Sequence, residues 1–173
     1  MVKMPKELLD VIKRIHIAAL ATVGPDGRPN VSPKGFTYLD EETLAYVDIY
    51  SARTLDNIRA RPQVAVAIWD TRAVEGYQVK GTARIHGPGD PVYEEVVARY
   101  VRAHHPDGRG VPERMIVVSI KVEEVYSLRP EDRGSAWPEG GSERRSHLID
   151  SKGSQWLPHG LKKRPTLAAG AGI

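Results

Sequence analysis

A serine, an arginine and a threonine stand together at the start of a short amphipathic segment, residues 50–61. These residues, Ser51, Arg53 and Thr54, directly follow a strand-like run at 43–48. The first turn of a helix has backbone N–H groups without intrahelical acceptors and carries a partial positive charge. Hydroxyl and guanidinium groups placed there can complete a binding site for a phosphate dianion. The pattern therefore predicts a phosphorylated cofactor.

Each of these side chains also has a purely structural interpretation. Ser51 and Thr54 can cap the helix, a role that is compatible with phosphate binding. Arg53 can be a solvated surface cation, but a cation in the first turn opposes the helix dipole, which favours an anionic partner. We therefore favour the phosphate role for Arg53.

The composition limits the fold and its chemistry. A chain of 173 residues is long enough for one domain with a core. Cysteine is absent, which excludes disulfides, thiolate catalysis and Cys-ligated metal sites. The N-terminal segment lacks the apolar region of a signal peptide, and no run reaches membrane-spanning length. We expect a soluble cytoplasmic protein.

Nucleic-acid binding and metal binding are both disfavoured. The net charge of +3 suits anionic ligands, but the basic cluster at 161–165 has no interleaved aromatic residues and no recognisable binding motif. His104 and His105 could ligate a metal or haem, yet adjacent histidines in a Pro/Gly loop point in different directions and lack a third spaced ligand. We expect neither a nucleic-acid partner nor a resident metal.

Hydrophobic periodicity predicts six strands and three helices. The segment 17–23 is apolar on both faces, as in a strand that is buried on both sides. A Pro-Asp-Gly turn joins it to the next strand as a hairpin. The links between strands are too short for parallel crossovers, so we predict a mainly β fold, a six-stranded antiparallel barrel with helical caps. The predicted strands are 17–23, 29–38, 43–48, 63–69, 77–86 and 115–128, and the predicted helices are 5–15, 50–61 and 91–103.

Two of the predicted strands present polar faces on which a ligand could bind. The two-residue period of a strand puts Asn30, Ser32 and Lys34 on one face of the second strand. The same period puts Gln78 and Lys80 on the polar face of the fifth strand. A lysine that points outward from a barrel strand is commonly only solvated. The residue types alone therefore make these two faces candidate ligand sites and no more.

Beyond residue 130 the periodic pattern ends. The segment 131–173 is rich in Gly, Pro, Ser and charge and poor in aliphatic residues, so it is disordered or is ordered by a partner surface. Trp137 and Trp156 favour the second alternative, because large aromatic residues in such a segment usually pack on something. We predict a domain at 1–130 and a tail that can wrap a partner subunit.

Several short motifs occur in an order and spacing that are more specific than any one of them. They are Ala19-Leu-Ala-Thr22, Asp26-Gly-Arg-Pro29, Val31-Ser-Pro-Lys-Gly35, Ser51-Ala-Arg-Thr-Leu-Asp-Asn57, Arg61-Pro-Gln-Val64 and Gly76-Tyr-Gln-Val-Lys-Gly-Thr-Ala83. Through these motifs the chain resembles the flavin-binding split β-barrel family typified by pyridoxamine 5'-phosphate oxidase. The resemblance extends over residues 15–128.

The resemblance implies a homodimer that binds flavin mononucleotide (FMN) at two sites across the subunit interface. It also implies an FMN-dependent oxidoreductase that acts on a small substrate. By family position, Arg53 and Thr54 hold the phosphate and Ser51 or Asn57 assists, while Lys34 reaches the flavin or its phosphate. The resemblance places the backbone of Asn30, Val31 and Ser32, with Tyr46 and Val47, along the flavin ring, and makes Gln78 and Lys80 candidates for contacts to the ring or ribityl chain. If the tail crosses to the partner subunit, we expect Trp137 or the segment around it to cover the flavin ring.

The chain departs from the family's vitamin-processing oxidase at one point. That enzyme carries an Arg-Leu-x-Pro segment near its C-terminus that holds the phosphorylated substrate, whereas residues 125–130 of this chain read Val-Tyr-Ser-Leu-Arg-Pro. We therefore do not expect pyridoxamine 5'-phosphate oxidase activity itself, and no nucleophile or acid–base pair identifies catalytic residues. Two alternatives stay open: an FMN-binding electron-transfer or carrier protein without its own organic substrate, and a relative that binds a deazaflavin coenzyme or haem.

Overall fold

The computed structural model describes residues 2–129 and 132. All of these residues belong to the first of the two units into which the chain divides, Met1–Ser142. The predicted tail at 131–173 lies outside the described residues except for Asp132. The tail and its role at a partner subunit therefore stay predictions.

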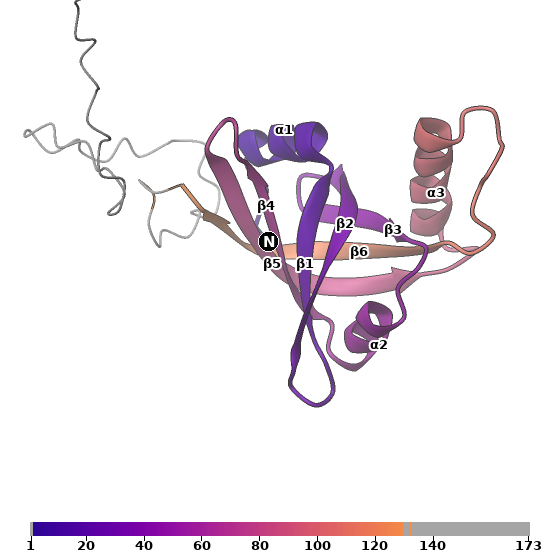
Figure 1. The fold of residues 1–173 in the computed structure, drawn as a ribbon, viewed down its shortest axis with the longest axis horizontal. Helices are drawn as coiled ribbons and strands as arrows, with labels where there is room; N and C mark the ends of the chain where they lie inside the picture. The colour runs from indigo at the N-terminus through magenta and orange to yellow at the C-terminus, as the bar shows by residue number, and fades with distance from the viewer. Residues whose placement is uncertain (1, 130–131, 133–173) are drawn as a thin grey trace, which may run out of the picture. The chain divides into compact units, whose positions relative to one another are not determined.

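The described part of the chain forms six strands and three helices, and the strands close into one antiparallel barrel in the order β1-β2-β3-β6-β5-β4 (Figure 1). This confirms the predicted fold class. No helix in the described ranges is long and apolar enough to cross a membrane. The elements are α1 Lys6–Ile15, β1 Ile17–Val23, β2 Pro29–Asp40, β3 Thr43–Asp48, α2 Arg53–Ala60, β4 Gln63–Asp70, β5 Glu75–His86, α3 Pro91–His104 and β6 Ile116–Ser127.

The hairpin between β1 and β2 decides which side chains point into the barrel. Gly27 adopts a φ of 81°, in the left-handed region that favours glycine, and the Gly24 N–H donates to the Arg28 carbonyl at 2.9 Å. The register that follows from this turn pairs Asn30 with Thr22, which is 1% exposed. Alternate residues of β2 from Asn30 onward therefore share the inner face of β1.

One apolar cluster fills the barrel, and all six strands contribute to it. Helix α1 adds Leu8, Val11 and Ile12 at helical spacing and packs against β2, β4 and β5. Helix α2 packs against β1 and β5, and Figure 1 shows α1 and α2 on either side of the strands. The two helices thus cover different parts of the same barrel.

Helix α3 packs on the outer surface of β3 and β6. Its contacts form a separate apolar cluster centred on Ala45, Val96 and Val117. The helix begins at Pro91, and the side chain of its N-cap residue, Asp90, accepts the Val92 N–H at 2.9 Å. Helix α3 therefore covers one side of the outer surface of the barrel.

The prediction that β1 is buried on both faces is wrong. Ala18, Leu20 and Thr22 point into the barrel, whereas Ile17 on the other face is 63% exposed. A closed barrel has one inner and one outer face, so the core can bury only alternate residues of each strand. The apolar residues on the outer face of β1 therefore lie at the surface of the described chain.

Candidate functional site

The start of α2 has backbone donors without acceptors. Ala52, the N-cap residue, has no side chain that could cap the helix. The first helical N–H with an acceptor one turn back is that of Asp56, which lies 3.0 Å from the Ala52 carbonyl oxygen. The N–H groups of Arg53, Thr54 and Leu55 therefore have no acceptor within the helix. Such groups can bind an anion.

Arg53 places a cation beside these N–H groups. Its side chain is exposed and makes no ion pair or hydrogen bond with any residue that the structure describes. The other arginine of α2, Arg59, is paired with Asp56 at 2.9 Å. Arg53 is therefore the arginine of this helix that is free to neutralise a bound phosphate.

Lys34, Asp48 and Ser51 form a partly buried group next to the start of α2. The Lys34 Nζ donates to Asp48 Oδ2 at 2.9 Å and also contacts Ser51 Oγ. The other carboxylate oxygen of Asp48 accepts the Ser51 N–H at 2.8 Å. The side chains of Lys34 and Asp48 are 12% and 1% exposed. Lys34, a predicted ligand contact, is thus already ion-paired within the chain.

The polar face of β2 packs against α2. Ser32 Oγ and Thr54 Oγ1 lie 3.2 Å apart, and the Asn30 amide lies 3.3 Å from Thr22 Oγ1 and 3.4 Å from Thr54 Oγ1. The Asn57 amide donates to Thr22 Oγ1 at 3.0 Å. Thr54 and Asn57 are buried, so their side chains tie α2 to β1 and β2. The backbone N–H of Thr54 is the polar group of this residue that has no acceptor among the described residues.

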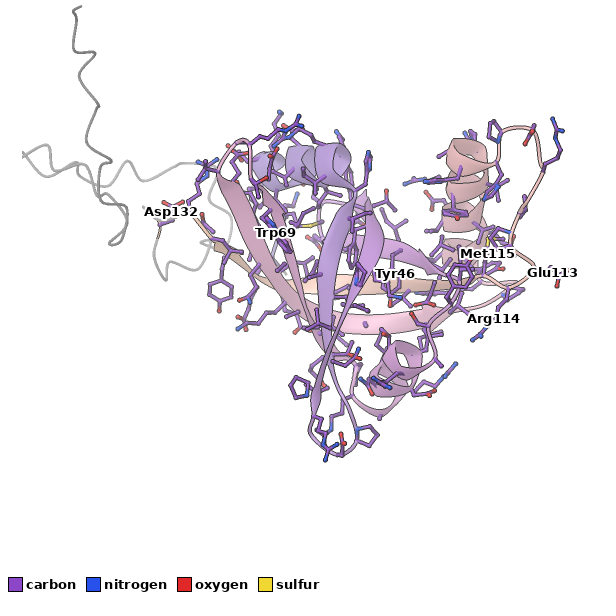
Figure 2. All side chains as sticks on the ribbon, in the orientation of Figure 1. Tyr46, Trp69, Glu113, Arg114, Met115 and Asp132 are labelled. Atoms are coloured by element: carbon purple, nitrogen blue, oxygen red, sulfur yellow. The ribbon has the colours of Figure 1, made fainter. Side chains whose placement is uncertain are left out.

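Tyr46 and Val47 lie on opposite faces of β3. Tyr46, labelled in Figure 2, points into the barrel and is 1% exposed. Its ring packs edge-on against Phe36, with ring centroids 5.3 Å apart. Its hydroxyl has no hydrogen-bond partner within the described residues. Burial, with a smaller contribution from Asp48, raises the pKa of Tyr46 above the ordinary value for tyrosine. Val47 packs under α3, so the two side chains do not line one surface.

The predicted residues Val31, Gln78 and Lys80 belong to the outer surface of the barrel. Gln78 and Lys80 alternate along β5 with Tyr77 and Val79, which point into the core. Lys80 forms an ion pair of 3.0 Å with a glutamate of β6. The strand registers place these residues on the same surface as a row of small side chains, namely Ala19, Ala21, Ala65 and Ala67.

Of the predicted site residues that the structure describes, all but Val47, which packs under α3, form two groups on opposite faces of the barrel wall. One copy of the chain cannot present both groups to one ligand. Trp137 lies outside the described residues. The group on the inner face and around α2 contains Asn30, Ser32, Lys34, Tyr46, Ser51, Arg53, Thr54 and Asn57, and the group on the outer surface contains Val31, Gln78 and Lys80.

Sequence reasoning missed the role of Asp48. This residue ends β3 and lies three residues before Ser51, whose N–H it accepts. A carboxylate at the end of a strand commonly closes a turn in this way, so the spacing was a usable signal. Its pairing with Lys34, which is on another strand, could not be read from the sequence.

A second polar cluster joins β5, β6 and the start of α3. The His86 Nδ1 atom is 2.8 Å from Asp90 Oδ2, and its Nε2 atom is 2.8 Å from Ser119 Oγ. The hydrogen bond with His86 is the largest of the causes that lower the pKa of Asp90. A serine, histidine and aspartate in this order also form hydrolase triads. Ser119, however, lies in the middle of β6 between two paired strands, where N–H groups bond to neighbouring strands instead of forming an oxyanion hole. The cluster anchors α3.

His104 and His105 do not converge on a common point. The Nδ1 atom of His104 lies 3.0 Å from the Tyr100 carbonyl oxygen, and that of His105 lies 3.0 Å from the Arg109 carbonyl oxygen. Within residues 2–129 and 132, no group of three His, Asp or Glu side chains could hold a metal ion. The start of α2 therefore provides the best-supported ligand site of the described residues.

The fold and the start of α2 together define a class of protein. A closed six-stranded antiparallel barrel with a helix start that follows its third strand is the architecture of the split-barrel proteins related to pyridoxamine 5'-phosphate oxidase. The model of the pyridoxamine 5'-phosphate oxidase family matches residues 4–129. The chain belongs to this family.

Solved structures share this fold. HupZ from Group A Streptococcus is 30% identical, with a TM-score of 0.62 over 73% of this chain and 95% of HupZ. A proposed pyridoxamine 5'-phosphate oxidase from Lactobacillus delbrueckii is 30% identical, with a TM-score of 0.59 over 72% of this chain and 93% of that protein. HutZ, the haem storage protein from Vibrio cholerae, is 18% identical, with a TM-score of 0.60 over 72% and 94%, and shares the fold alone.

Proposed function

We propose that this protein binds FMN and is an FMN-dependent oxidoreductase that acts on a small substrate. The observation that supports it is the start of α2, where N–H groups and the Arg53 guanidinium without partners among the described residues follow the Ser51 hydroxyl in the chain. These are the groups that a phosphate monoester needs. Family membership, which rests on residues 4–129, makes a flavin phosphate the first candidate.

The residues present fit the phosphate end of FMN. Arg53 supplies the positive charge, and the N–H groups of Arg53, Thr54 and Leu55 with the Ser51 hydroxyl supply the donors. When bound, the flavin supplies hydride or electron transfer, and the protein contributes position and electrostatics. Lys34 contacts the Ser51 hydroxyl but is ion-paired with Asp48, so we assign this group the binding of the cofactor and no acid–base step.

The proposal includes a homodimer. The outer surface around the alanine row also exposes large apolar side chains, and Figure 2 shows one of them, Trp69, on β4 at the end away from α2. Exposed apolar surface of this kind marks interaction sites. A second copy on this surface could bring the outer group, with Gln78 and Lys80, against a flavin that the first copy holds at α2. The exposed apolar residues are Ile17, Val31, Trp69 and Leu128.

Pyridoxamine 5'-phosphate is not proposed as the substrate. Arg129, the arginine in the reordered segment near the end of β6, is 19% exposed and forms an ion pair with Glu75. Glu75 also pairs with Arg14 at 3.2 Å. An arginine that is held in such a network is not free to bind a substrate phosphate. The proposed substrate is therefore a small molecule other than this phosphorylated vitamin.

An absorption spectrum after reconstitution tests the proposal. Purified full-length protein is mixed with FMN, passed through a desalting column and scanned. We expect the protein to retain about one equivalent of FMN per chain and to show the absorption bands of an oxidised flavin. Protein that comes off the column colourless would exclude the proposed function. A haem or a deazaflavin carried from the host would give a different spectrum, so the same scan separates the ligands.

An FMN-binding electron-transfer or carrier protein is the second candidate. One observation favours it: the basic side chain of the α2 group that could move a proton, Lys34, is ion-paired with the buried Asp48. A carrier would show a reversible one-electron couple and slow turnover with every organic donor. An oxidoreductase would show flavin reduction by one donor at a rate that saturates with its concentration.

A further inference from the structure

Asp48 is the most buried charged group near the start of α2, and neither the sequence patterns nor the family resemblance gives it a part in ligand binding. Its side chain is 1% exposed, and both of its oxygens are engaged. One accepts the Lys34 ammonium at 2.9 Å and the other accepts the Ser51 N–H at 2.8 Å. Asp48 therefore fixes both a cation and the backbone of the residue that precedes the N-cap of α2.

The contact between Lys34 and Ser51 determines where the serine hydroxyl points. An ammonium group has only donors, so Ser51 Oγ must accept from the Lys34 Nζ. A hydroxyl whose oxygen accepts one bond directs its own hydrogen to a different acceptor. The Ser51 N–H is taken by Asp48, so the hydroxyl hydrogen is the one donor that Ser51 still offers.

The charges of Lys34 and Asp48 cancel. Two of the three ammonium donors of Lys34 are engaged by Asp48 and Ser51, and moving Lys34 to a bound phosphate would leave Asp48 as an unpaired buried carboxylate, which is strongly unfavourable. The exposed Arg53, which has no partner among the described residues, can neutralise a phosphate without this cost. The phosphate charge is thus met by Arg53, and Lys34 stays with Asp48.

We propose that Asp48 and Lys34 are positioning residues of the phosphate site, which hold the Ser51 hydroxyl as a donor to the phosphate without touching it themselves. This inference rests on the proposed FMN binding. It differs from the expectation from the resemblance, in which Lys34 itself reaches the flavin or its phosphate.

The test compares FMN with riboflavin, which differ only in the phosphate. Both are titrated into flavin-free, full-length protein by quenching of flavin fluorescence. The variants are S51A, K34M/D48N, which removes both charges and keeps an acceptor for the Ser51 N–H, and the triple combination. We expect S51A and K34M/D48N each to raise the Kd for FMN about tenfold, as for loss of one hydrogen bond to a charged group. The triple variant should lose no more, and the Kd for riboflavin should not change.

Three results would overturn the positioning role. Losses that add in the triple variant would mean that Lys34 contacts the phosphate itself. An unchanged Kd for FMN in K34M/D48N would mean that the pair has no part in binding. Equal losses for FMN and riboflavin would mean that the pair only supports the fold. The matched control is K6M/D10N, which removes an exposed ion pair of 2.7 Å from α1 and should change neither Kd.

The single variant D48N keeps the test decisive if K34M/D48N does not fold. It leaves Lys34 charged and without its partner. A lysine that acts on the phosphate would then bind FMN more tightly than in the wild type, whereas the positioning role requires weaker FMN binding with riboflavin unchanged. Wild-type protein that binds neither flavin contradicts the proposed function, and the inference with it. Wild-type protein that prefers FMN while the variants behave otherwise contradicts only the inference.

Discussion

Ser32 Oγ and Thr54 Oγ1 lie 3.2 Å apart, and this contact joins β2 to α2. The family resemblance predicts that both residues contact FMN. The structure shows Thr54 buried, with its hydroxyl also 3.4 Å from the Asn30 amide. A hydroxyl that bonds to its own protein fixes the helix on the barrel, which keeps the N–H groups of the first turn in place. The contribution of the Thr54 side chain to a ligand is therefore indirect, through the position of α2.

Replacing Thr54 by valine tests this structural role. Valine keeps the shape but leaves Ser32 and Asn30 without a hydroxyl partner in the interior, so we expect the free energy of unfolding to fall by about 1–3 kcal/mol. Urea denaturation measures the change. The Kd ratio of FMN to riboflavin should stay as in the wild type. The control is T71V at an exposed turn position, which should leave stability nearly unchanged.

Replacing Arg53 by alanine tests the phosphate site. Because the guanidinium has no partner in the part of the chain that the structure describes and belongs to the first turn of α2, we expect the Kd for FMN to rise about tenfold or more, as for loss of a charge-assisted bond. Riboflavin binding should not change. R59A removes the other arginine of α2, which is paired with Asp56, and should affect neither flavin. Equal losses for the two flavins in R53A would show that Arg53 has no phosphate to bind.

Sequence patterns predicted the elements and the barrel well, because hairpin turns and alternating apolar residues are local signals. They could not predict which face of a strand becomes the interior when both faces are apolar, and this is why the prediction for β1 was wrong. The same limit applies to the site. The position of Arg53 at a helix start is local and was found, whereas the pairing of Lys34 with Asp48 depends on the closure of the barrel. The polar side chains of Asn30 and Ser32 resemble ligand contacts in the sequence because their partners on α2 are brought to them only by the fold.

Replacing Tyr46 by phenylalanine tests the interior of the barrel. The Tyr46 hydroxyl is buried without a hydrogen-bond partner in the described part of the chain, which is an unfavourable state for a polar group. We expect Y46F to raise the free energy of unfolding by about 1 kcal/mol. Y50F changes an exposed tyrosine and should have no effect. A fall in stability in Y46F would instead show that the hydroxyl binds a buried water molecule.

The acid stability of the protein should depend on Asp70. The hydrogen bond with Arg14, 2.8 Å long, and two backbone N–H groups lower the pKa of Asp70 from its ordinary value of 3.8. Above that value the carboxylate is charged in both the folded and the unfolded chain, and its stabilising contacts are fully present. As the pH falls through that value, the unfolded chain binds the proton first, so this stabilisation is lost progressively.

Urea denaturation between about pH 6 and pH 3 measures this dependence. We expect D70N to be less stable than the wild type at the upper end and to lose less stability on acidification. R14M removes the largest cause of the lowered pKa and should flatten the curve in the same direction. Parallel curves for the wild type and both variants would show that the Asp70 contacts do not form in solution.

The outer surface of the barrel should be the dimer interface. Ala67 lies on β4 in the row of small side chains, between Ala19 of β1 and Gln78 of β5. An arginine at this position adds a long charged side chain to a row of small residues that the proposed dimer buries, so we expect A67R to turn a dimer into a monomer in sedimentation equilibrium. Both flavins should then bind more weakly, because the ring lies at the interface in the proposed dimer. A98R places the same side chain on an exposed position of α3 and should leave the dimer intact. A wild-type protein that sediments as a monomer would contradict the dimer, and with it the assignment of Gln78 and Lys80 to the flavin of a second copy.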